Sequence, residues 1–337
     1  MKILIYSPQF SPSVGGVEAV AEMLATEWTA LGESVTVLCH TPDPAARSHP
    51  FTVLRQPSAI QLWRQVGAAD WVVHICVSLK GLGPILLLGK PWAISHQTWY
   101  RRPDGCTAWQ DHLKRFATRF AAVNIAASQA IAAHLPSPAI VIGNPYADDI
   151  FQIDPTARRD RDLIFVGRFV SDKGVDLLLD ALADLAPAGL LPQLTLVGDG
   201  PDRAALAAQG ERLGLSDRLT FTGPLPPAAV AAQLNRHRIL VVPSRWPEPF
   251  GIVALEGLAC GCVVVGSEEG GLKDAIGPGG VTVPNGDRAA LATALTTLLT
   301  HPDPWNHYHT HLPPHLQAHQ QHTVARRYLK ALQSIKS

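Results

Sequence analysis

The chain has 337 residues, of which 47% are hydrophobic, and its 28 basic side chains are balanced by 28 acidic ones. This length and apolar content are sufficient for two α/β domains with substantial cores, and they exclude a largely disordered chain. The formal net charge of zero argues against a protein that binds nucleic acid through its bulk charge.

Apolar runs alternate with a helical pattern along the first half of the chain. A helix is predicted from about residue 17 to residue 31, directly after the first run. The runs typical of buried strands are residues 3–6, 34–39, 71–76, 92–95 and 123–127. Such alternation favours a parallel sheet covered by helices.

The second half repeats this pattern without repeating the sequence. Its predicted strands are residues 163–166, 194–197, 219–221, 239–242 and 263–265. A polar, proline-containing segment at 149–161 separates the two series and is predicted to be a linker. We therefore expect a first domain at 1–148, a second domain at 162–314 and a C-terminal segment at 315–337, with a helix over about 317–334.

The cysteines and the hydropathy pattern indicate a soluble protein of a reducing compartment. The cysteines are odd in number and have no CxxC spacing; they are Cys39, Cys76, Cys106, Cys260 and Cys262. Met1 leads directly into a predicted strand, which leaves no room for a signal peptide. The longest apolar stretch, residues 81–89, is too short to cross a bilayer. We expect a cytoplasmic protein, at most peripheral at the inner face of the membrane.

Two glutamates flank a predicted helix start in the second half. Glu248 follows the apolar run that ends near residue 244, and Pro249 marks the expected first turn because its missing N–H would be unpaired there. The N–H groups of Phe250 and Gly251 would then form an anion site. Glu256 would lie about two turns into the helix. Two carboxylates beside an anion site suit a ligand that joins a phosphate to sugar hydroxyls.

Glycine turns after two strands offer further phosphate contacts. Gly15 and Gly16 lack side chains, so backbone N–H groups there can approach a phosphate. Gly167 precedes Arg168 and Lys173, and a flexible loop could bring both cations to one diphosphate. The first loop lacks GxGxxG spacing and no acid ends the second strand, which disfavours a dehydrogenase.

Five segments in order resemble the motifs of retaining glycosyltransferases of the GT-B fold, in particular glycosyltransferase family 4. They are residues 11–18, 165–174, 197–201, 248–256 and 266–272. The resemblance extends over nearly the whole chain. It implies an α/β fold of two Rossmann-like domains facing each other across a cleft, with the C-terminal helix crossing back onto the N-terminal domain. The first domain would bind the acceptor and the second the nucleotide sugar.

The same resemblance implies roles for individual residues. Arg168 and Lys173 would hold the diphosphate and stabilise the charge that develops as the sugar–phosphate bond breaks. Glu256 would bind the ribose hydroxyls, and Glu248 would contact the transferred sugar. Complementing the helix dipole is an alternative for Glu248, but it suits Glu256 poorly. The other implied donor-binding residues are Gly15, Gly16, Gly167, Phe250, Gly251, Gly270 and Gly271.

His96 follows the predicted strand 92–95, and relatives often have a histidine in this region on the acceptor side. The resemblance therefore implies a catalytic role, and a structural loop histidine is the equal alternative. His74 lies inside a predicted strand and is expected to be packed.

No metal or other cofactor is expected. Asp160 and Asp162 match the DxD pattern of GT-A enzymes, but they precede a strand instead of following one, which indicates linker charge. The histidine-rich segment 301–322 contains prolines typical of an irregular exposed segment. Arg168, Lys173 and a helix N-terminus could neutralise a diphosphate without a metal.

Residues 99–120 interleave aromatic and basic side chains. They include Trp99, Tyr100, Arg101, Arg102, Trp109, Lys114, Arg115, Phe116, Arg119 and Phe120. This pattern suits contact with an anionic membrane surface or a lipid-linked acceptor. A solvated helix with one core face is the alternative.

The sequence therefore predicts a retaining hexosyltransferase that moves a sugar from a nucleotide-diphosphate sugar to an acceptor hydroxyl. The acceptor would be a saccharide or a lipid-linked saccharide, in the synthesis of a cell-surface or storage glycoconjugate. Another GT-B enzyme, such as a sugar-nucleotide epimerase or a disaccharide phosphorylase, and a catalytically silent binding subunit remain alternatives.

Overall fold

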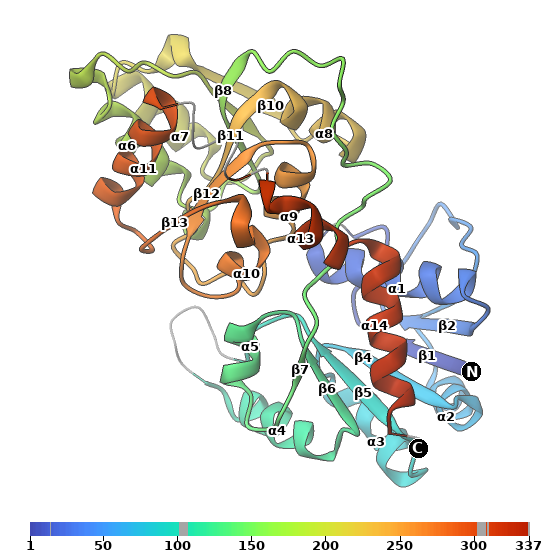
Figure 1. The fold of residues 1–337 in the computed structure, drawn as a ribbon. Coiled ribbons are helices and arrows are strands. Elements are labelled where there is room, and N and C mark those ends of the chain that lie inside the picture. The colour runs from blue at the N-terminus through green and yellow to red at the C-terminus, as the bar shows by residue number, and fades with distance from the viewer. Residues whose placement is uncertain (14, 101–106, 302–307, 309, 336–337) are drawn as a thin grey trace. The chain divides into compact units, whose positions relative to one another are not determined.

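The computed structural model describes all residues except 14, 101–106, 302–307, 309 and 336–337. It divides into two compact units (Figure 1). Unit 1 combines Met1–Pro145 with Gln321–Ser337, and unit 2 is Tyr146–Gln320. Each unit is a parallel sheet with helices packed on it, which confirms the predicted α/β class.

Unit 1 contains a seven-stranded sheet in the order β3-β2-β1-β4-β5-β6-β7, and all its pairs are parallel. Its strands are β1 (Lys2–Tyr6), β2 (Ser34–Cys39), β3 (Thr52–Arg55), β4 (Trp71–Ile75), β5 (Trp92–His96), β6 (Val123–Ala126) and β7 (Ile140–Val141). The central strands β4 and β5 are buried along their whole length. Strands covered on both faces read as continuous apolar runs, which is why the sequence predicts them.

The helices of unit 1 lie between strands of this sheet in the chain, except α14, which is the last element of the chain. They are α1 (Gly16–Ala30), α2 (Ala59–Ala68), α3 (Leu79–Leu87), α4 (Trp109–Ala117), α5 (Gln129–His134) and α14 (Gln321–Gln333). Tyr6, Leu38, Val72 and Ile94 belong to one core cluster of this unit.

Unit 2 contains a six-stranded parallel sheet in the order β10-β9-β8-β11-β12-β13. Its strands are β8 (Arg161–Val166), β9 (Leu194–Val197), β10 (Leu219–Gly223), β11 (His237–Val242), β12 (Val263–Ser267) and β13 (Gly280–Val283). Its helices are α6 (Val175–Ala183), α7 (Arg203–Arg212), α8 (Pro227–Arg236), α9 (Ile252–Ala259), α10 (Leu272–Ile276), α11 (Arg288–Thr300) and α13 (Leu312–Ala318). The sequence does not predict β3, β7 or β13.

The C-terminal helix belongs to unit 1, as the resemblance implies. The Trp28 indole N–H of α1 donates to the carbonyl of Ala325 at 3.0 Å, and the Tyr328 hydroxyl pairs with Ser95 Oγ at 2.9 Å. α1 and α14 lie side by side (Figure 1). Tyr328 and Trp28 are fully buried, so α14 completes the core of this unit.

The helix predicted over about 317–334 is present as α14, but it starts later than predicted, at Gln321, because α13 ends at Ala318 and the chain breaks between the two helices. Between them, the carbonyl of His319 accepts the N–H of Tyr146 at 3.2 Å, and Tyr146 forms a bridge with Gln320. An uninterrupted helix would need that carbonyl for its own ladder. The chain therefore breaks where these two segments pair.

The segment predicted as a linker, 149–161, is packed within unit 2. The N–H of Asp154 donates to Asn235 Oδ1 at 2.8 Å, and the Arg159 guanidinium donates to the carbonyl of Cys260 at 2.7 Å. Phe151 is buried. The units consequently divide at Pro145 and Tyr146, a few residues before the predicted boundary.

Two smaller observations concern thiols and membrane spans. Cys39, Cys76, Cys260 and Cys262 are free thiols, and Cys106 lies outside the described residues. Within the described part of the chain, no helix combines the length and hydrophobicity needed to span a bilayer.

Candidate functional site

The order of strands in unit 2 reverses between β8 and β11, and we refer to this point as the crevice of unit 2. The chain continues from β8 to β9 and β10 on one side, and from β11 to β12 and β13 on the other. In open parallel sheets, ligands bind beyond the carboxyl ends of the strands where this order reverses. The segments that follow β8 and β11 contain Lys173 and Glu248, so two predicted motifs meet at this point.

Glu248 is the centre of the polar contacts at this crevice. Its Oε1 accepts from Lys173 Nζ at 2.5 Å and from Ser244 Oγ at 2.6 Å. The two charged side chains are only partly exposed, 26% for Lys173 and 13% for Glu248. Charge-assisted hydrogen bonds of this kind are among the stronger ones in proteins. The pair holds both side chains at the end of the sheet.

The third predicted motif, Gly270 and Gly271, contacts the backbone of Glu248. The N–H of Gly271 donates to the Glu248 carbonyl at 2.7 Å, and Gly270 forms a bridge with Glu248. Gly270 has a φ of 87°, and a Cβ there would lie 2.4 Å from that carbonyl oxygen. Only glycine fits at residue 270. The loops after β8, β11 and β12 therefore all contribute to the contacts of Glu248.

The loops after β8 and β11 are fixed to each other by further contacts. Gly174 has a φ of 68°, and a Cβ there would lie 2.0 Å from the carbonyl oxygen of Pro243. Arg245 donates to both carboxylate oxygens of Asp176, at 2.5 and 2.8 Å, and its N–H donates to the carbonyl of Asp172. These contacts set the position of Lys173 and Glu248 before any ligand arrives.

Arg168 differs from Lys173 in having a free charge. Its side chain is exposed, and within the described part of the chain no residue forms an ion pair or hydrogen bond with its guanidinium. Gly167, just before it, donates its N–H to the carbonyl of Val197. The loop after β8 therefore presents one unpaired and one paired cation.

The predicted start of the helix after Glu248 is wrong. α9 begins at Ile252, three residues after Pro249, and Gly251 at its N-cap has a left-handed φ of 98°. Helical geometry starts only after this residue, so Phe250 and Gly251 cannot supply the first-turn N–H groups. The leading N–H groups belong to Ile252 and Val253.

Glu256 consequently lies about one turn into α9, since it is four positions after Ile252. Burial raises the pKa of its carboxyl from the ordinary 4.5 to about 7. No described residue forms an ion pair or hydrogen bond with this carboxyl. A partly buried carboxyl with a raised pKa and no described partner marks a candidate binding position.

Gly15 and Gly16 belong to unit 1, apart from the residues described so far. Gly15 is the N-cap of α1 and Gly16 is its first residue. A Cβ on Gly15 would lie 2.5 Å from Glu18 Oε2, and Glu18 is buried. The missing side chain at residue 15 thus makes room for the Glu18 carboxyl.

His96 ends β5 and is fully buried, with both ring nitrogens occupied. Nδ1 pairs with the Tyr100 hydroxyl at 2.7 Å and Nε2 with Asn124 Oδ1 at 2.9 Å. Burial lowers the pKa of His96 to about 4, so the ring is neutral at pH 7. These are properties of a packed histidine, and the acceptor-side role stays a prediction. His74, also buried, stacks on Tyr6 with ring centroids 4.9 Å apart.

The acidic pair before β8 is engaged with protein groups. Asp160 forms an ion pair with Arg236 at 3.1 Å, and Asp162 accepts the N–H of Gln193 at 3.0 Å. Among the residues described, no group of three or more histidine, cysteine, aspartate or glutamate side chains could hold a metal ion. Most of 302–309 in the histidine-rich segment lies outside the described residues.

Residues 147–310 match the family described as glycosyl transferases group 1. This range spans the loops that bring Lys173, Glu248 and Gly270 together. The likeness to this family is therefore carried by unit 2.

Curated relatives resemble part of this chain. The 2-deoxystreptamine glucosyltransferase of Streptomyces kanamyceticus is 37% identical over 143 residues, which cover 42% of this chain and 36% of that protein. A glycogen synthase of Mycobacterium tuberculosis is 36% identical over 152 residues, covering 43% of this chain and 36% of that protein. The chain thus spans about a third of the length of the curated relatives it matches.

Solved structures resemble the whole chain in fold. Sucrose-phosphate synthase from Thermosynechococcus elongatus gives a TM-score of 0.81 at 21% identity, covering 99% of both chains. Anabaena HepE in complex with UDP gives 0.85 at 20% identity, covering 99% of this chain and 100% of that one. The fold is that of the GT-B glycosyltransferases, as predicted.

Sequence reasoning missed the residues that orient the Lys173–Glu248 pair of unit 2. Ser244 lies at the end of β11 and carries no motif of its own. Arg245 and Asp176 are 69 positions apart, so only the fold brings them together. The available signal in the sequence was the presence of two polar residues, Ser244 and Arg245, between β11 and Glu248.

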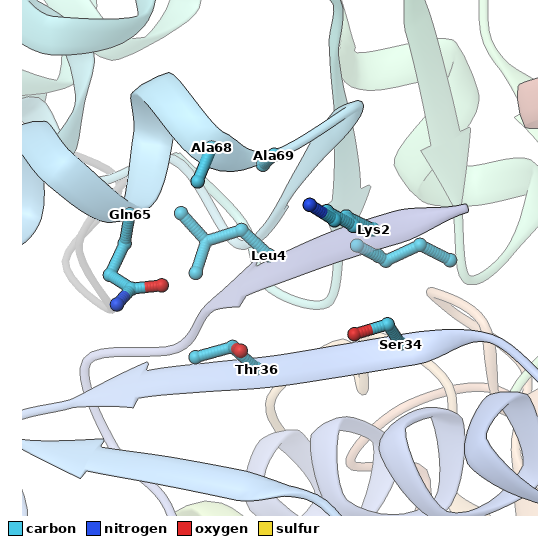
Figure 2. A pocket seen from close by; sticks show the side chains of 8 residues that line it. Lys2, Leu4, Ser34, Thr36, Gln65, Ala68 and Ala69 are labelled. Carbon is cyan, nitrogen blue, oxygen red and sulfur yellow. The ribbon is translucent and has the colours of Figure 1, made fainter.

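A separate cavity of about 200 Å³ lies in unit 1 between β1, β2 and α2 (Figure 2). Lys2 and Ser34, the first residues of their strands, line it together with Gln65 of α2. It therefore opens at the amino ends of the strands, opposite to the end where parallel sheets bind ligands. We assign it no part in the site.

Replacing Glu256 by glutamine should change how stability depends on pH. In the unfolded chain this carboxyl ionises near 4.5, whereas in the folded chain it keeps its proton to about 7. The wild type should lose stability relative to Glu256→Gln between these values, by on the order of 3 kcal/mol at pH 8. Urea unfolding across this pH range measures it, with Glu211→Gln as an exposed control. Parallel curves for Glu256→Gln and wild type would contradict the raised pKa of this carboxyl.

Proposed function

We propose that the chain is a retaining glycosyltransferase of family 4, which moves a sugar from a nucleotide-diphosphate sugar to an acceptor hydroxyl. The observation that carries the proposal is the convergence of Lys173, Ser244 and Gly270 on Glu248 at the crevice of unit 2. The acceptor would be a saccharide or a lipid-linked saccharide, and the protein would work in the cytoplasm.

The charges at the crevice suit a diphosphate. Arg168 is free to bind one phosphate. Lys173, five positions later in the same loop, is held by its ion pair with Glu248. An arriving diphosphate would compete with Glu248 for Lys173. That exchange would release the Glu248 carboxylate toward a hydroxyl of the donor sugar. In this scheme, the ligand-free ion pair keeps both groups positioned until the donor replaces one of them.

Glu256 would serve the nucleotide part of the donor. Its carboxyl has no protein partner among the described residues and lies one turn beyond the start of α9. Ribose hydroxyls can donate to such a group. HepE, a neighbour in fold, has been solved with UDP and with UDP-glucose. These complexes make a UDP-sugar the first donor to test.

Retention of configuration would follow from a same-face displacement. The acceptor oxygen bonds to the anomeric carbon as the bond from that carbon to the phosphate oxygen breaks. The leaving phosphate takes the acceptor's proton. Arg168, Lys173 and the N–H groups at the start of α9 would stabilise the charge on that phosphate. Because these groups supply positive charge, we propose that transfer needs no metal.

We expect Arg168→Ala and Lys173→Ala to impair turnover more than folding. Loss of one contact to transition-state charge costs about 3 kcal/mol, on the order of a hundredfold in rate. Turnover of UDP-sugars is measured with and without EDTA, with exposed Arg212→Ala as the control. Unimpaired turnover in both folded variants would remove the diphosphate assignment, and EDTA loss restored by Mg²⁺ would remove metal independence.

The two glutamates should separate in their effects. Glu256→Ala should weaken UDP binding, because a hydrogen bond to a charged group is worth about 1.5–3 kcal/mol. Glu248→Ala should not weaken UDP binding, because the diphosphate then has no competitor for Lys173, but it should lose sugar transfer. Calorimetry and turnover distinguish these outcomes, with Glu211→Ala as the control. The reverse pattern would mean that the donor lies along α9 in the opposite direction.

The product analysis also tests the alternative enzymes. An epimerase would convert the nucleotide sugar without an acceptor, and a phosphorylase would require inorganic phosphate. A silent binding subunit would bind UDP without transferring or hydrolysing any sugar. Each outcome is separated by analysing products with and without acceptor and phosphate.

We also propose that α4 contacts an anionic membrane surface. Trp109, Leu113 and Phe116 repeat at helical spacing and are 69%, 43% and 51% exposed. Arg119 lies 5.8 Å from the centre of the Phe116 ring. If α4 were an ordinary solvated helix with one core face, these apolar side chains would point to the core. Instead, Ala117 is the buried residue of this helix. Exposed aromatic side chains beside cations suit anionic lipid.

Neighbouring basic and aromatic side chains extend the same surface. Its further members are Lys114, Arg115 and Phe120, and Arg101 and Arg102 lie outside the described residues. Tyr100, predicted as part of this surface, is buried and contacts His96 instead. The charge of this surface opposes that of an anionic leaflet.

The double variant Trp109→Ser with Phe116→Ser should reduce binding to vesicles that contain anionic lipid by about tenfold or more. Each substitution removes apolar area that would otherwise leave water. Vesicle sedimentation measures the change, with Trp63→Ser on α2, another exposed tryptophan, as the matched control. Equal binding of the double variant and wild type would exclude α4 as the contact.

A further inference from the structure

Unit 1 has its own crevice where the order of strands reverses. The chain runs from β1 to β2 and β3 on one side, and the remaining strands continue from β4 on the other. A cavity of about 420 Å³ opens beyond the carboxyl ends of these strands. Pro8 follows β1, His40 follows β2, and Val77 and Ser78 follow β4. This is where a doubly wound sheet binds its ligand.

Hydrogen-bonding groups line this cavity. His40 Nε2 pairs with the Tyr6 hydroxyl at 3.0 Å, and Ser78 also hydrogen-bonds to Tyr6. Ser78 is the N-cap of α3, but its side chain does not cap the helix. The first N–H groups of α3, at Leu79 and Lys80, therefore begin at the cavity wall without a side-chain acceptor.

The charged side chains that line the cavity are two lysines. Lys80 is exposed, and in the described part of the chain nothing pairs with its ammonium group. Lys114, from α4, lies 3.8 Å from Asp111, and that carboxylate also accepts the N–H of Ala108. No acidic side chain lines the cavity as described. The lining of the cavity is therefore positively charged, which suits an anionic ligand better than a neutral sugar.

We infer that this cavity binds the anionic group of the acceptor, a phosphate, through Lys80, Lys114 and the start of α3. The inference rests on the proposed function, because it names the class of acceptor for that reaction. Two lysines and uncapped helix N–H groups match the charge and the acceptor oxygens of a phosphate. His40, Ser78 and Gln110 would contact the sugar hydroxyls beside it. The phosphate could belong to a soluble sugar phosphate or to a lipid headgroup.

The test compares charged and neutral probes on the full chain. Calorimetry is performed with glucose 6-phosphate and with glucose, and sedimentation with phosphatidylinositol vesicles and with phosphatidylcholine vesicles. The variants are Lys80→Gln and Lys114→Gln, and Lys330→Gln, an exposed lysine of α14, is the control. UDP binding is measured on every protein as a readout of unit 2.

The wild type should bind at least one phosphate-bearing probe about tenfold more tightly than its neutral counterpart. Lys80→Gln and Lys114→Gln should each remove most of that preference, while Lys330→Gln keeps it and all proteins bind UDP equally. Preference for glucose 6-phosphate identifies a soluble acceptor, and preference for phosphatidylinositol that depends on Lys80, which lies outside α4, identifies a headgroup.

The inference is overturned if the wild type shows no preference for either phosphate probe, or if both cavity variants retain it. Failure of the proposed function looks different. In that case the phosphate preference and its dependence on Lys80 remain, but the wild type binds no UDP and transfers no sugar.

Discussion

The loops of unit 2 that hold Lys173 and Glu248 depend on the close contact between Gly174 and the carbonyl of Pro243. No side chain fits at residue 174, because a Cβ would lie 2.0 Å from that oxygen. The contact joins the loops after β8 and β11 at the reversal of the sheet. Lys173 directly precedes this glycine, and Ser244 directly follows this proline. This backbone packing therefore brings the side chains of Lys173 and Glu248 together.

The charged side chains at the crevice differ in their exposure to water. The Lys173–Glu248 pair is mostly withdrawn from water, whereas Arg168 keeps its hydration. A partly buried ion pair persists because separating it would leave a charge without compensation. A ligand with its own negative charge offers that compensation. Glu256 provides the opposite case, since its carboxyl has no cation among the described residues and burial raises its pKa.

How much the sequence predicts follows from burial. The inner strands are covered on both faces, so they read as apolar runs and are found. β3, β7 and β13 lie at sheet edges, have two to four residues and are half exposed, which leaves little pattern. Motif order located Glu248 and Lys173, but their contact arises only in three dimensions. The start of α9 was misplaced because the left-handed conformation of Gly251 cannot be read from a proline signal.

The C-terminal helix has a consequence for how the protein is made. Unit 2 is a continuous segment, whereas unit 1 needs α14 as well as residues 1–145. On the ribosome, the face of α1 that carries Trp28 therefore stays uncovered while the whole of unit 2 is synthesised. The Trp28 N–H finds the Ala325 carbonyl only after that segment has left the exit tunnel. The core of unit 1 is therefore completed only after the last residues of unit 2 have been synthesised.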